Sequence, residues 1–324
     1  MRTFADSHTV EIFYSSLYRQ FLAPNNATHE SIGFVMEKPW FSSYYCTWDT
    51  FRTYFPFLSL HSAADYADVV GDYVESWKHT GIIPECRANG VPGWKQGGSD
   101  GTNVVADFAV KYFNLADQLG VNISQLHDAL ISDAFSSPAD WNRGGRQIDD
   151  WRKYHYLPYY GPSNVIPLKT REASRSLEYA QNDFAAFVVS RLVNDTVNAS
   201  QLRDSALWYS NVFDQGVESQ GFSNFVQQRY PNGAFRYVDP ITCSPIDTDW
   251  SRSCSMQLEN SYGTYESSSW EYSLYAPHDM AVLIKLLASS LSQPRLDDEQ
   301  NLFIRRLDKF FELGLHKPGN EPSF

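Results

Sequence analysis

Amphipathic segments with helical spacing recur along most of the chain and limit the folds open to it. In the clearest of them, Leu177, Phe184 and Val188 fall on one face of a helix predicted over residues 174–193. Further helices are predicted over residues 8–22, 63–80, 103–119, 123–135, 198–213, 280–291 and 297–313. Only residues 222–240 have a partly extended pattern, and no strand–helix–strand alternation occurs. The sequence therefore predicts a mainly α-helical fold.

Long loops rich in aromatic residues separate these helices. Residues 41–53 form an aromatic run, residues 81–101 form a Gly/Pro loop, and residues 140–170 are irregular and rich in Tyr, Pro, Arg and Asp. Loops of this length inside a compact chain are usually functional or disordered. Helices joined by long aromatic loops favour a helical toroid whose site is built from loops at one end.

Charge and hydropathy exclude several classes of partner. The formal net charge is −12 and there is no basic tract, so neither nucleic acid nor an anionic membrane surface is an expected partner. No run of about eighteen apolar residues occurs, so no membrane span is expected. The N-terminal residues are polar and lack the apolar core of a signal peptide, which leaves a cytoplasmic or unknown location for this chain by itself.

Cysteines and glycosylation sequons bear on the cellular compartment. Cys243 and Cys254 flank a polar loop and either form a disulfide or remain thiols, whereas Cys46, within an aromatic run, is interpreted as a buried thiol. Asn-X-Ser/Thr sequons begin at Asn26, Asn122, Asn194 and Asn198. This number of sequons favours a secretory route that the N-terminus does not itself encode.

The stretch from Tyr262 to Asp279 carries the clearest functional signal. It contains two carboxylates, Glu266 and Glu271, among tyrosines and a tryptophan. Sugar-binding sites combine aromatic rings, on which apolar sugar faces stack, with acids that hydrogen-bond to hydroxyls, and an apolar setting lets an acid keep its proton at neutral pH. An aromatic core segment whose acids point to water is the alternative.

Five sequence blocks resemble, in order and spacing, those of glycoside hydrolase family 92, the calcium-dependent, inverting α-mannosidases. They are YCTWDTFRT at 45–53, GIIP and QGGS within 81–99, SRSLEYAQNDF at 174–184, YESSSWEYS and PHDM within 265–280, and RLDKFF and GNEPSF within 306–324. The blocks extend over nearly the whole chain, which is most similar to the fungal branch of the family.

The resemblance implies a domain organisation. Residues 1–30 correspond to a connecting helix, and residues 31–324 to a partial (α/α)6 barrel, a toroid of helical hairpins. In the family an N-terminal β-sandwich precedes the barrel, and the site lies between the two. The resemblance therefore implies a truncated member that lacks the β-sandwich and the C-terminal part of the barrel.

Glu266 stands at the position that the family uses for the general acid. Inverting glycoside hydrolysis needs one carboxyl that protonates the leaving oxygen and a second that deprotonates a water. Tyr265 and Trp270 are expected to form an apolar surround that raises the pKa of this carboxyl. The family usually has Gly after the acid, so Ser267 is expected to strain the loop if that position has a positive φ. Glu271 is the alternative acid.

The resemblance assigns a sugar-binding wall to Trp48, Asp49 and Arg52. Trp offers a stacking face, and Asp and Arg hydrogen-bond to hydroxyls. A core Trp beside a surface ion pair is the alternative. Gln96, which precedes two glycines, belongs to the rim of the same site by resemblance.

Three more residues complete the substrate-binding set. Trp270 belongs to the surround of the acid, and Glu271 is assigned to hydrogen-bonding with substrate or to a structural role. His278 follows in the Pro-His-Asp turn, where the structural alternative is that Asp279 only caps the next helix.

Asn320 and Glu321 match the Gly-Asn-Glu-Pro element that binds calcium in the family. An amide oxygen and a carboxylate are suitable ligands for a hard cation that takes six to eight oxygens. The alternative is a disordered tail. In the family the general base is an aspartate C-terminal to this element, so the resemblance implies that the base and part of the calcium site lie outside these residues.

Two functions follow from the resemblance. The first is an exo-α-mannosidase, of α-1,2 type, that acts on α-mannoside oligosaccharides of N-glycans or mannoproteins, secreted or in the secretory pathway. The second is a non-catalytic remnant that binds mannosides weakly, because the base and part of the calcium site are missing. An unrelated toroid acting on other sugars would require that the Glu266 and metal motifs both match by chance.

Overall fold

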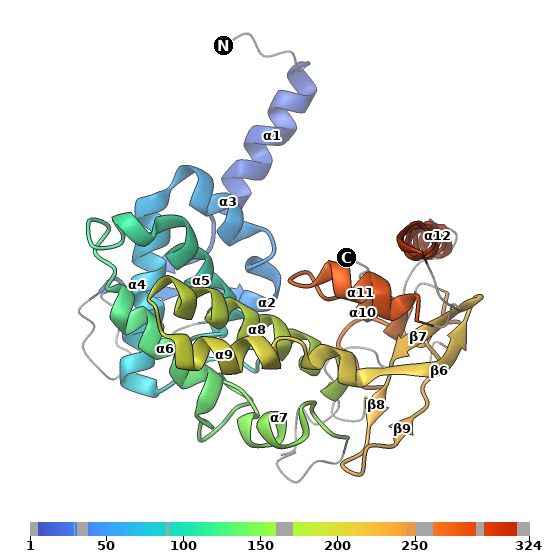
Figure 1. The fold of residues 1–324 in the computed structure, drawn as a ribbon. Coiled ribbons are helices and arrows are strands. Elements are labelled where there is room, and N and C mark those ends of the chain that lie inside the picture. The colour runs from blue at the N-terminus through green and yellow to red at the C-terminus, as the bar shows by residue number, and fades with distance from the viewer. Residues whose placement is uncertain are drawn as a thin grey trace.

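Helices dominate the structure (Figure 1), as the sequence predicts. The computed structural model describes residues 6–28, 30, 38–88, 91–159, 171–244, 246–249, 262–289 and 295–315. The α-helices are α1 (Ser7–Gln20), α2 (Thr47–Thr50), α3 (Tyr54–His61), α4 (Ala63–Thr80), α5 (Asp100–Tyr112), α6 (Ile123–Phe135), α7 (Ile148–Tyr154), α8 (Glu172–Leu192), α9 (Thr196–Ser205), α10 (Ser269–Tyr272), α11 (Met280–Leu287) and α12 (Leu296–Leu315). Two 3-10 helices are η1 (Phe113–Leu115) and η2 (Trp208–Val212).

The strands are short and pair only locally. They are β1 (Asn25–Asn26), β2 (Phe41–Ser42), β3 (Tyr45–Cys46), β4 (Cys86–Ala88), β5 (Val91–Pro92), β6 (Phe213–Ser219), β7 (Phe222–Val226), β8 (Gln228–Arg229) and β9 (Phe235–Arg236). All pairs among them are antiparallel: β1–β2, β3–β4–β5, the hairpin β6–β7, and β8–β9. These small sheets flank the helices and do not form a separate layer.

One large core joins the helices of the N-terminal half. Aromatic side chains of α3 and α4, among them Phe55 and Tyr73, pack there against Phe108 of α5 and Leu130 of α6. Helix α4 spans the predicted residues 63–80, and it ends because Gly81 takes a left-handed conformation with a φ of 76°.

A second core surrounds the N-terminal half of α8, which is buried on all sides. Trp151 of α7, Leu177 of α8, Tyr209 and Leu283 of α11 pack together in it. Helix α7 lies in the segment that the sequence predicted to be irregular, because its seven residues are too few for a clear periodic pattern. The predicted helix over 198–213 is shorter than expected: it ends at Ser205 and the chain then turns into η2 and β6.

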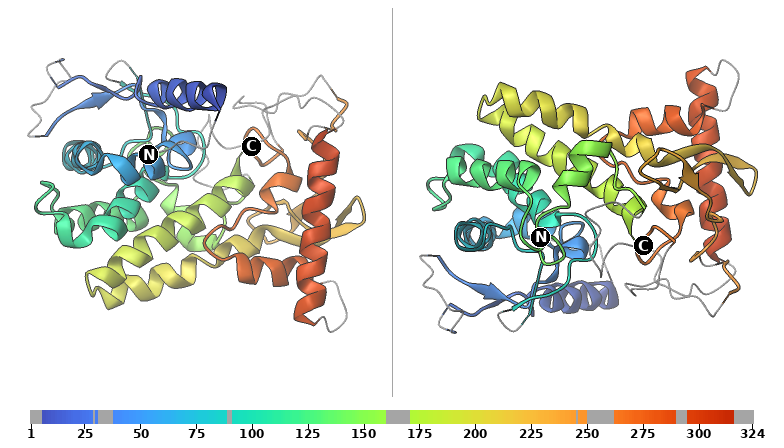
Figure 2. Two further views of the ribbon diagram at one scale, coloured as in Figure 1. Left: turned by 90° about the horizontal axis from the view of Figure 1, so that it is seen from above. Right: turned by 90° about the horizontal axis from the view of Figure 1, so that it is seen from below.

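Helices α1 and α12 lie at the periphery of the described structure (Figure 1). Helix α1 leads out from the body of the molecule (Figure 1), and none of its residues is buried. Helix α12 runs along one side of the molecule, next to the β6–β7 hairpin (Figure 2). It is anchored by buried Arg306, whose guanidinium donates to the backbone oxygens of Ser223 (2.7 Å) and Asn224 (3.2 Å).

Candidate active site

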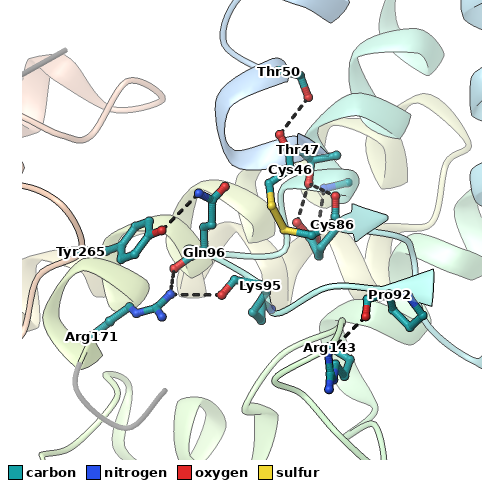
Figure 3. The surroundings of a disulfide bond; sticks show 12 residues. Cys46, Thr47, Thr50, Cys86, Pro92, Lys95, Gln96, Arg143, Arg171 and Tyr265 are labelled. Atoms are coloured by element: carbon teal, nitrogen blue, oxygen red, sulfur yellow. Dashed lines mark hydrogen bonds between the residues drawn. A yellow bond between two sulfur atoms is a disulfide. The ribbon is translucent and has the colours of Figure 1, made fainter. Parts of the chain in front are cut away.

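A disulfide fixes the start of the segment predicted to bind sugar. Cys46 of β3 and Cys86 of β4 face each other across the sheet and are covalently joined (Figure 3). The prediction of a buried thiol at Cys46 was therefore wrong, because its partner lies 40 residues away in the sequence. Beside the bond, the Thr47 hydroxyl donates to Glu85 Oε2 at 2.5 Å. These links hold α2 against β4.

Trp48 and Arg52 project from the α2 region toward α8. The Trp48 indole Nε1 donates to Glu178 Oε1 at 2.6 Å, and Arg52 Nη2 lies 3.5 Å from the same oxygen. The guanidinium also lies 5.3 Å from the centre of the Trp48 ring and 5.1 Å from that of Tyr275. Trp48 is thus held in one orientation by a buried carboxylate and a stacked cation.

A cavity of about 240 Å³ opens beside this wall. Its lining residues are Trp48, Arg52, Ser267, Glu271, Tyr272, Leu274, Tyr275 and Phe310. The lining brings α2, the segment around α10 and helix α12 together, which are far apart in sequence. Aromatic rings with one guanidinium and one carboxylate are a surface suited to a polyhydroxylated ligand.

The loop that carries Glu266 is docked on the N-terminus of α8. The backbone oxygen of Gly263 accepts hydrogen bonds from the amides of Ala173 and Ser174, both at 3.0 Å, which satisfies donors that the first turn of a helix leaves unpaired. Within the loop, the Thr264 hydroxyl donates to Ser267 O at 2.7 Å. These bonds leave the backbone between Gly263 and Ser267 little freedom.

Glu266 itself takes the strained conformation in this loop, with a φ of 50°. Strain was expected at Ser267 only if that position had a positive φ; the positive φ falls one residue earlier, at Glu266. A left-handed conformation is uncommon for a residue other than glycine and persists only where the surroundings impose it. The docking of this loop on α8 supplies that constraint.

Tyr265 connects this loop to the Gly/Pro loop (Figure 3). Its hydroxyl accepts from Gln96 Nε2 at 3.1 Å, and the guanidinium of Arg171 lies 4.2 Å from the centre of its ring. Arg171 also donates to the backbone oxygens of Lys95 (3.0 Å) and Gln96. Burial and the charge of Glu266 together raise the pKa of Tyr265, so its hydroxyl keeps its proton beside that carboxylate.

Asp49 and Glu266 are neighbours in the structure. Burial raises the pKa of Asp49, and the charge of Glu266 raises it further. Asp49 Oδ2 is buried without a hydrogen-bond partner among the described residues, and so is Gln96 Oε1. Two half-buried carboxyls and an amide oxygen therefore converge where a hydroxylated ligand could satisfy them.

Three acids below the wall had no functional role in the sequence interpretation. Glu85, Asp100 and Glu178 are buried, and burial raises the pKa of each. The charge of Asp100 raises the pKa of Glu85 and of Glu178 further, and the charge of Asp49 raises the pKa of Asp100. Lys95 acts against the rise at all three acids, and Arg52 acts against it at Asp100 and Glu178. Their proximity depends on the Gly/Pro loop passing close to α8, which no local pattern reveals. A Cβ on Gly97 would lie 2.0 Å from Glu178 Oε2, so glycine is required at this position.

Comparisons with known proteins decide the family. The profile of the "Glycosyl hydrolase family 92 catalytic domain" matches residues 2–324. The chain belongs to glycosyl hydrolase family 92. A curated relative in this comparison, an "uncharacterized secreted glycosidase" of Arthroderma benhamiae, is 31% identical over 96% of this chain. The chain spans 36% of that relative's length.

Solved structures of family 92 enzymes share the fold of this domain. A family 92 α-mannosidase from Bacteroides thetaiotaomicron superposes with a TM-score of 0.71, at 19% identity over 95% of this chain and 36% of that one. Its complex with mannoimidazole gives a TM-score of 0.72 over 97% and 37%. An inverting mannosidase from the same organism gives 0.64, also at 19% identity, over 93% and 40%.

Glu271 and Trp270 are adjacent in the sequence, but their side chains lie in different parts of the family 92 domain. Glu271 lines the cavity and also completes a capping box with Ser268 at the start of α10. Trp270 is 2% exposed, packs 5.0 Å from Phe225 between ring centres, and donates to Ser219 Oγ at 3.1 Å. Its assignment to substrate binding is therefore corrected, because neighbouring residues of a helix point about 100° apart and Trp270 enters the core.

His278 lies in a second cavity, of about 390 Å³, between α5 and α8. Its Nε2 contacts Ala206 O at 2.9 Å, and its ring packs against Phe184 and Tyr209. The structure thus separates His278 from the wall with which the sequence grouped it. Asp279 occupies the N-cap position of α11, but its carboxylate accepts from Tyr209 instead of capping the helix.

The predicted calcium ligands Asn320 and Glu321 lie outside the described residues, as does Cys254. Cys243 is disulfide-bonded, which agrees with the first of the two alternatives for that cysteine. Among the described residues no group of three or more His, Cys, Asp or Glu side chains could hold a metal ion, and no helix is long and apolar enough to cross a membrane.

Proposed function

We propose that this family 92 domain contributes the acid side of an inverting exo-α-mannosidase site, with Glu266 as the general acid. The observation that carries the proposal is the conformation of Glu266. A positive φ holds it on a loop docked on α8, beside Asp49 and Tyr265 and next to the cavity wall. Strain of this kind concentrates at functional sites. We further propose that residues 31–324 form part of an (α/α)6 barrel and residues 1–30 its connecting segment.

The proposed ligand is the terminal mannose of an α-linked oligosaccharide. Trp48 and Tyr275 supply apolar ring surface, and Arg52 and Glu271 supply groups that hydrogen-bond to hydroxyls. The mannosidase structures with the same fold, one of them holding mannoimidazole, support a mannoside. The proposal includes an α-1,2 linkage on N-glycans or mannoproteins. It also includes a secretory location, in line with the description of the Arthroderma relative as a secreted glycosidase.

In the proposed reaction Glu266 gives its proton to the glycosidic oxygen as the bond to the anomeric carbon breaks. The proton donor must lie within reach of the glycosidic oxygen. The docked loop fixes the backbone of Glu266, and the residue lies beside Asp49 and Tyr265. Tyr265, kept protonated, can donate a hydrogen bond to the carboxylate that remains. Trp48 and Arg52 hold the ring while the proton moves.

We propose that Asn320 and Glu321 are ligands of a calcium ion. Among the described residues, no group of three or more His, Cys, Asp or Glu side chains could hold a metal ion.

Mannose release from α-1,2-mannobiose tests the proposal. Glu266→Gln keeps the size of the side chain and removes the acid, so release should fall by about 10²–10⁴-fold. Glu312→Gln, an exposed acid on α12, is the matched control and should leave release unchanged. Equal activity of wild type and Glu266→Gln would exclude Glu266 as the acid. Mannobiose binding without release in the wild type would instead support the non-catalytic alternative.

A further inference from the structure

The four sequons are not used by the proposed site, and the structure separates them into two kinds. Asn26, Asn122 and Asn194 are exposed, whereas Asn198 is half-buried. None of the four lines either of the two cavities described above. The side chains of all four asparagines therefore lie outside these two cavities.

At Asn26 and Asn122 the carboxamide oxygen is used and the nitrogen is left free. Asn26 Oδ1 accepts from the amide of Thr28 at 3.1 Å, and Asn122 Oδ1 accepts from the amide of Gln125 at 3.0 Å as the N-cap of α6. Neither Nδ2 donates a hydrogen bond within the described part of the chain. An N-linked sugar attaches to Nδ2, so both oxygen contacts survive the modification.

Asn194 lies in the turn between α8 and α9. Its φ is 62° and its side chain is exposed. The third residue of its sequon, Thr196, is also exposed. A sugar on this side chain extends into solvent without meeting either helix.

Asn198 differs, because its Nδ2 is already engaged. It donates to Asp195 Oδ2 at 2.6 Å, and the backbone amide of Asn198 donates to Asp195 Oδ1 at 3.1 Å. The residue lies on α9 beside buried Ala199.

We propose that Asn26, Asn122 and Asn194 carry N-linked oligosaccharides and that Asn198 remains unmodified. The proposal rests on the secretory route proposed above. The donor is an oligosaccharide on a polyprenyl diphosphate. Its anomeric carbon–oxygen bond breaks and the diphosphate leaves with that electron pair. The same carbon then bonds to Asn Nδ2, which loses one proton to the transferase.

Site-resolved mass spectrometry of the full chain, secreted by a yeast, tests this assignment. Peptide N-glycosidase in heavy-oxygen water converts each occupied Asn to a labelled Asp. Label is expected at Asn26, Asn122 and Asn194 and absent at Asn198. The variants Ser124→Ala and Thr196→Ala should each remove one glycan while keeping the Asn side chain. Ser200→Ala should remove none, and Thr28→Ser, which preserves its sequon, should also remove none.

Two results would overturn the assignment: label at Asn198 comparable to that at Asn194, or secreted chain without label at any of the three exposed sites. Mannoside binding by the same preparations is measured separately. If the glycans are found and mannosides do not bind, the modification stands and the proposed function falls. If mannosides bind and the chain is unmodified, the reverse holds.

Discussion

Trp48 and Glu178, 130 residues apart in the sequence, are joined by a 2.6 Å hydrogen bond from the indole nitrogen to the carboxylate. Glu178 has no exposure to solvent, so this bond satisfies a charge-bearing group that burial would otherwise penalise. The bond fixes the face that Trp48 presents to the cavity. The position of the proposed sugar-binding wall is therefore set by a helix that does not itself line the cavity.

Trp48→Phe should weaken both folding and mannoside binding. It removes the donor and leaves buried Glu178 Oε1 with only its 3.5 Å contact to Arg52. Loss of a buried hydrogen bond of this kind costs about 1–3 kcal/mol of unfolding free energy. Denaturant unfolding and calorimetric mannobiose titration measure the two effects. Trp94→Phe, at a side chain that is 44% exposed, is the control and should change neither. Unchanged stability of Trp48→Phe would show that the bond contributes nothing to the free energy of unfolding.

Gly97→Ala should disrupt the candidate site at the point where the Gly/Pro loop passes close to α8. The added Cβ would lie 2.0 Å from Glu178 Oε2 and 2.5 Å from Trp48 Cδ1, so both side chains would have to move. Overpacking of this kind typically costs about 1–3 kcal/mol, and mannoside affinity should fall with it. Gly216→Ala is the matched control, because the nearest atom to its new Cβ is 3.4 Å away. Wild-type affinity in Gly97→Ala would contradict the described approach of the loop to α8.

Removing the Cys46–Cys86 bond should destabilise the domain. The cysteines close a loop with a sequence separation of 40, for which chain entropy alone gives about 4 kcal/mol. The double variant Cys46→Ala/Cys86→Ala should therefore melt at a lower temperature. Mannoside affinity should fall too, because β3 leads directly into α2. A reducing agent should lower the melting temperature of the wild type more than that of the double variant, and equal shifts would argue against this role.

Stability should decline as the pH rises from about 5 to 8. Burial raises the pKa of Glu172 from 4.5 to about 7. The folded state therefore holds this proton more tightly than the unfolded state, and the stabilisation present below pH 4.5 is lost as the pH rises through 7. The loss amounts to about 3 kcal/mol at ~1.4 kcal/mol per pKa unit. Melting temperatures of wild type and Glu172→Gln across this range measure it. The variant should show a flatter profile, and parallel profiles would refute the assignment.

Local patterns allowed part of this architecture to be predicted. Residues 63–80 form a helix because apolar side chains repeat at its period and Gly81 can end it, and both signals lie within the segment. Trp48, Arg52 and Glu271, all three predicted to bind substrate, line one cavity. The positive φ occurs at Glu266 and not at Ser267, the position for which the sequence raised that possibility, because φ depends on how Gly263 docks on α8.

Long-range contacts explain what the sequence could not predict. The Cys46–Cys86 pair and the Trp48–Glu178 bond depend on how β4 and α8 pass the start of α2. Trp270 and His278 lie close to Glu266 in sequence, yet one side chain enters the β6–β7 core and the other a separate cavity. Nearness in sequence therefore gave the wrong neighbours for both residues.

Titration of the chain with mannoimidazole, comparing wild type with Glu266→Gln, tests whether Glu266 is the general acid. The imidazole nitrogen of this compound takes the place of the glycosidic oxygen and accepts the proton that a general acid donates. The wild type should bind, and Glu266→Gln should bind at least about 100-fold more weakly, because the proton donor is lost. Equal affinity for the two proteins, or no binding by the wild type, would contradict the account.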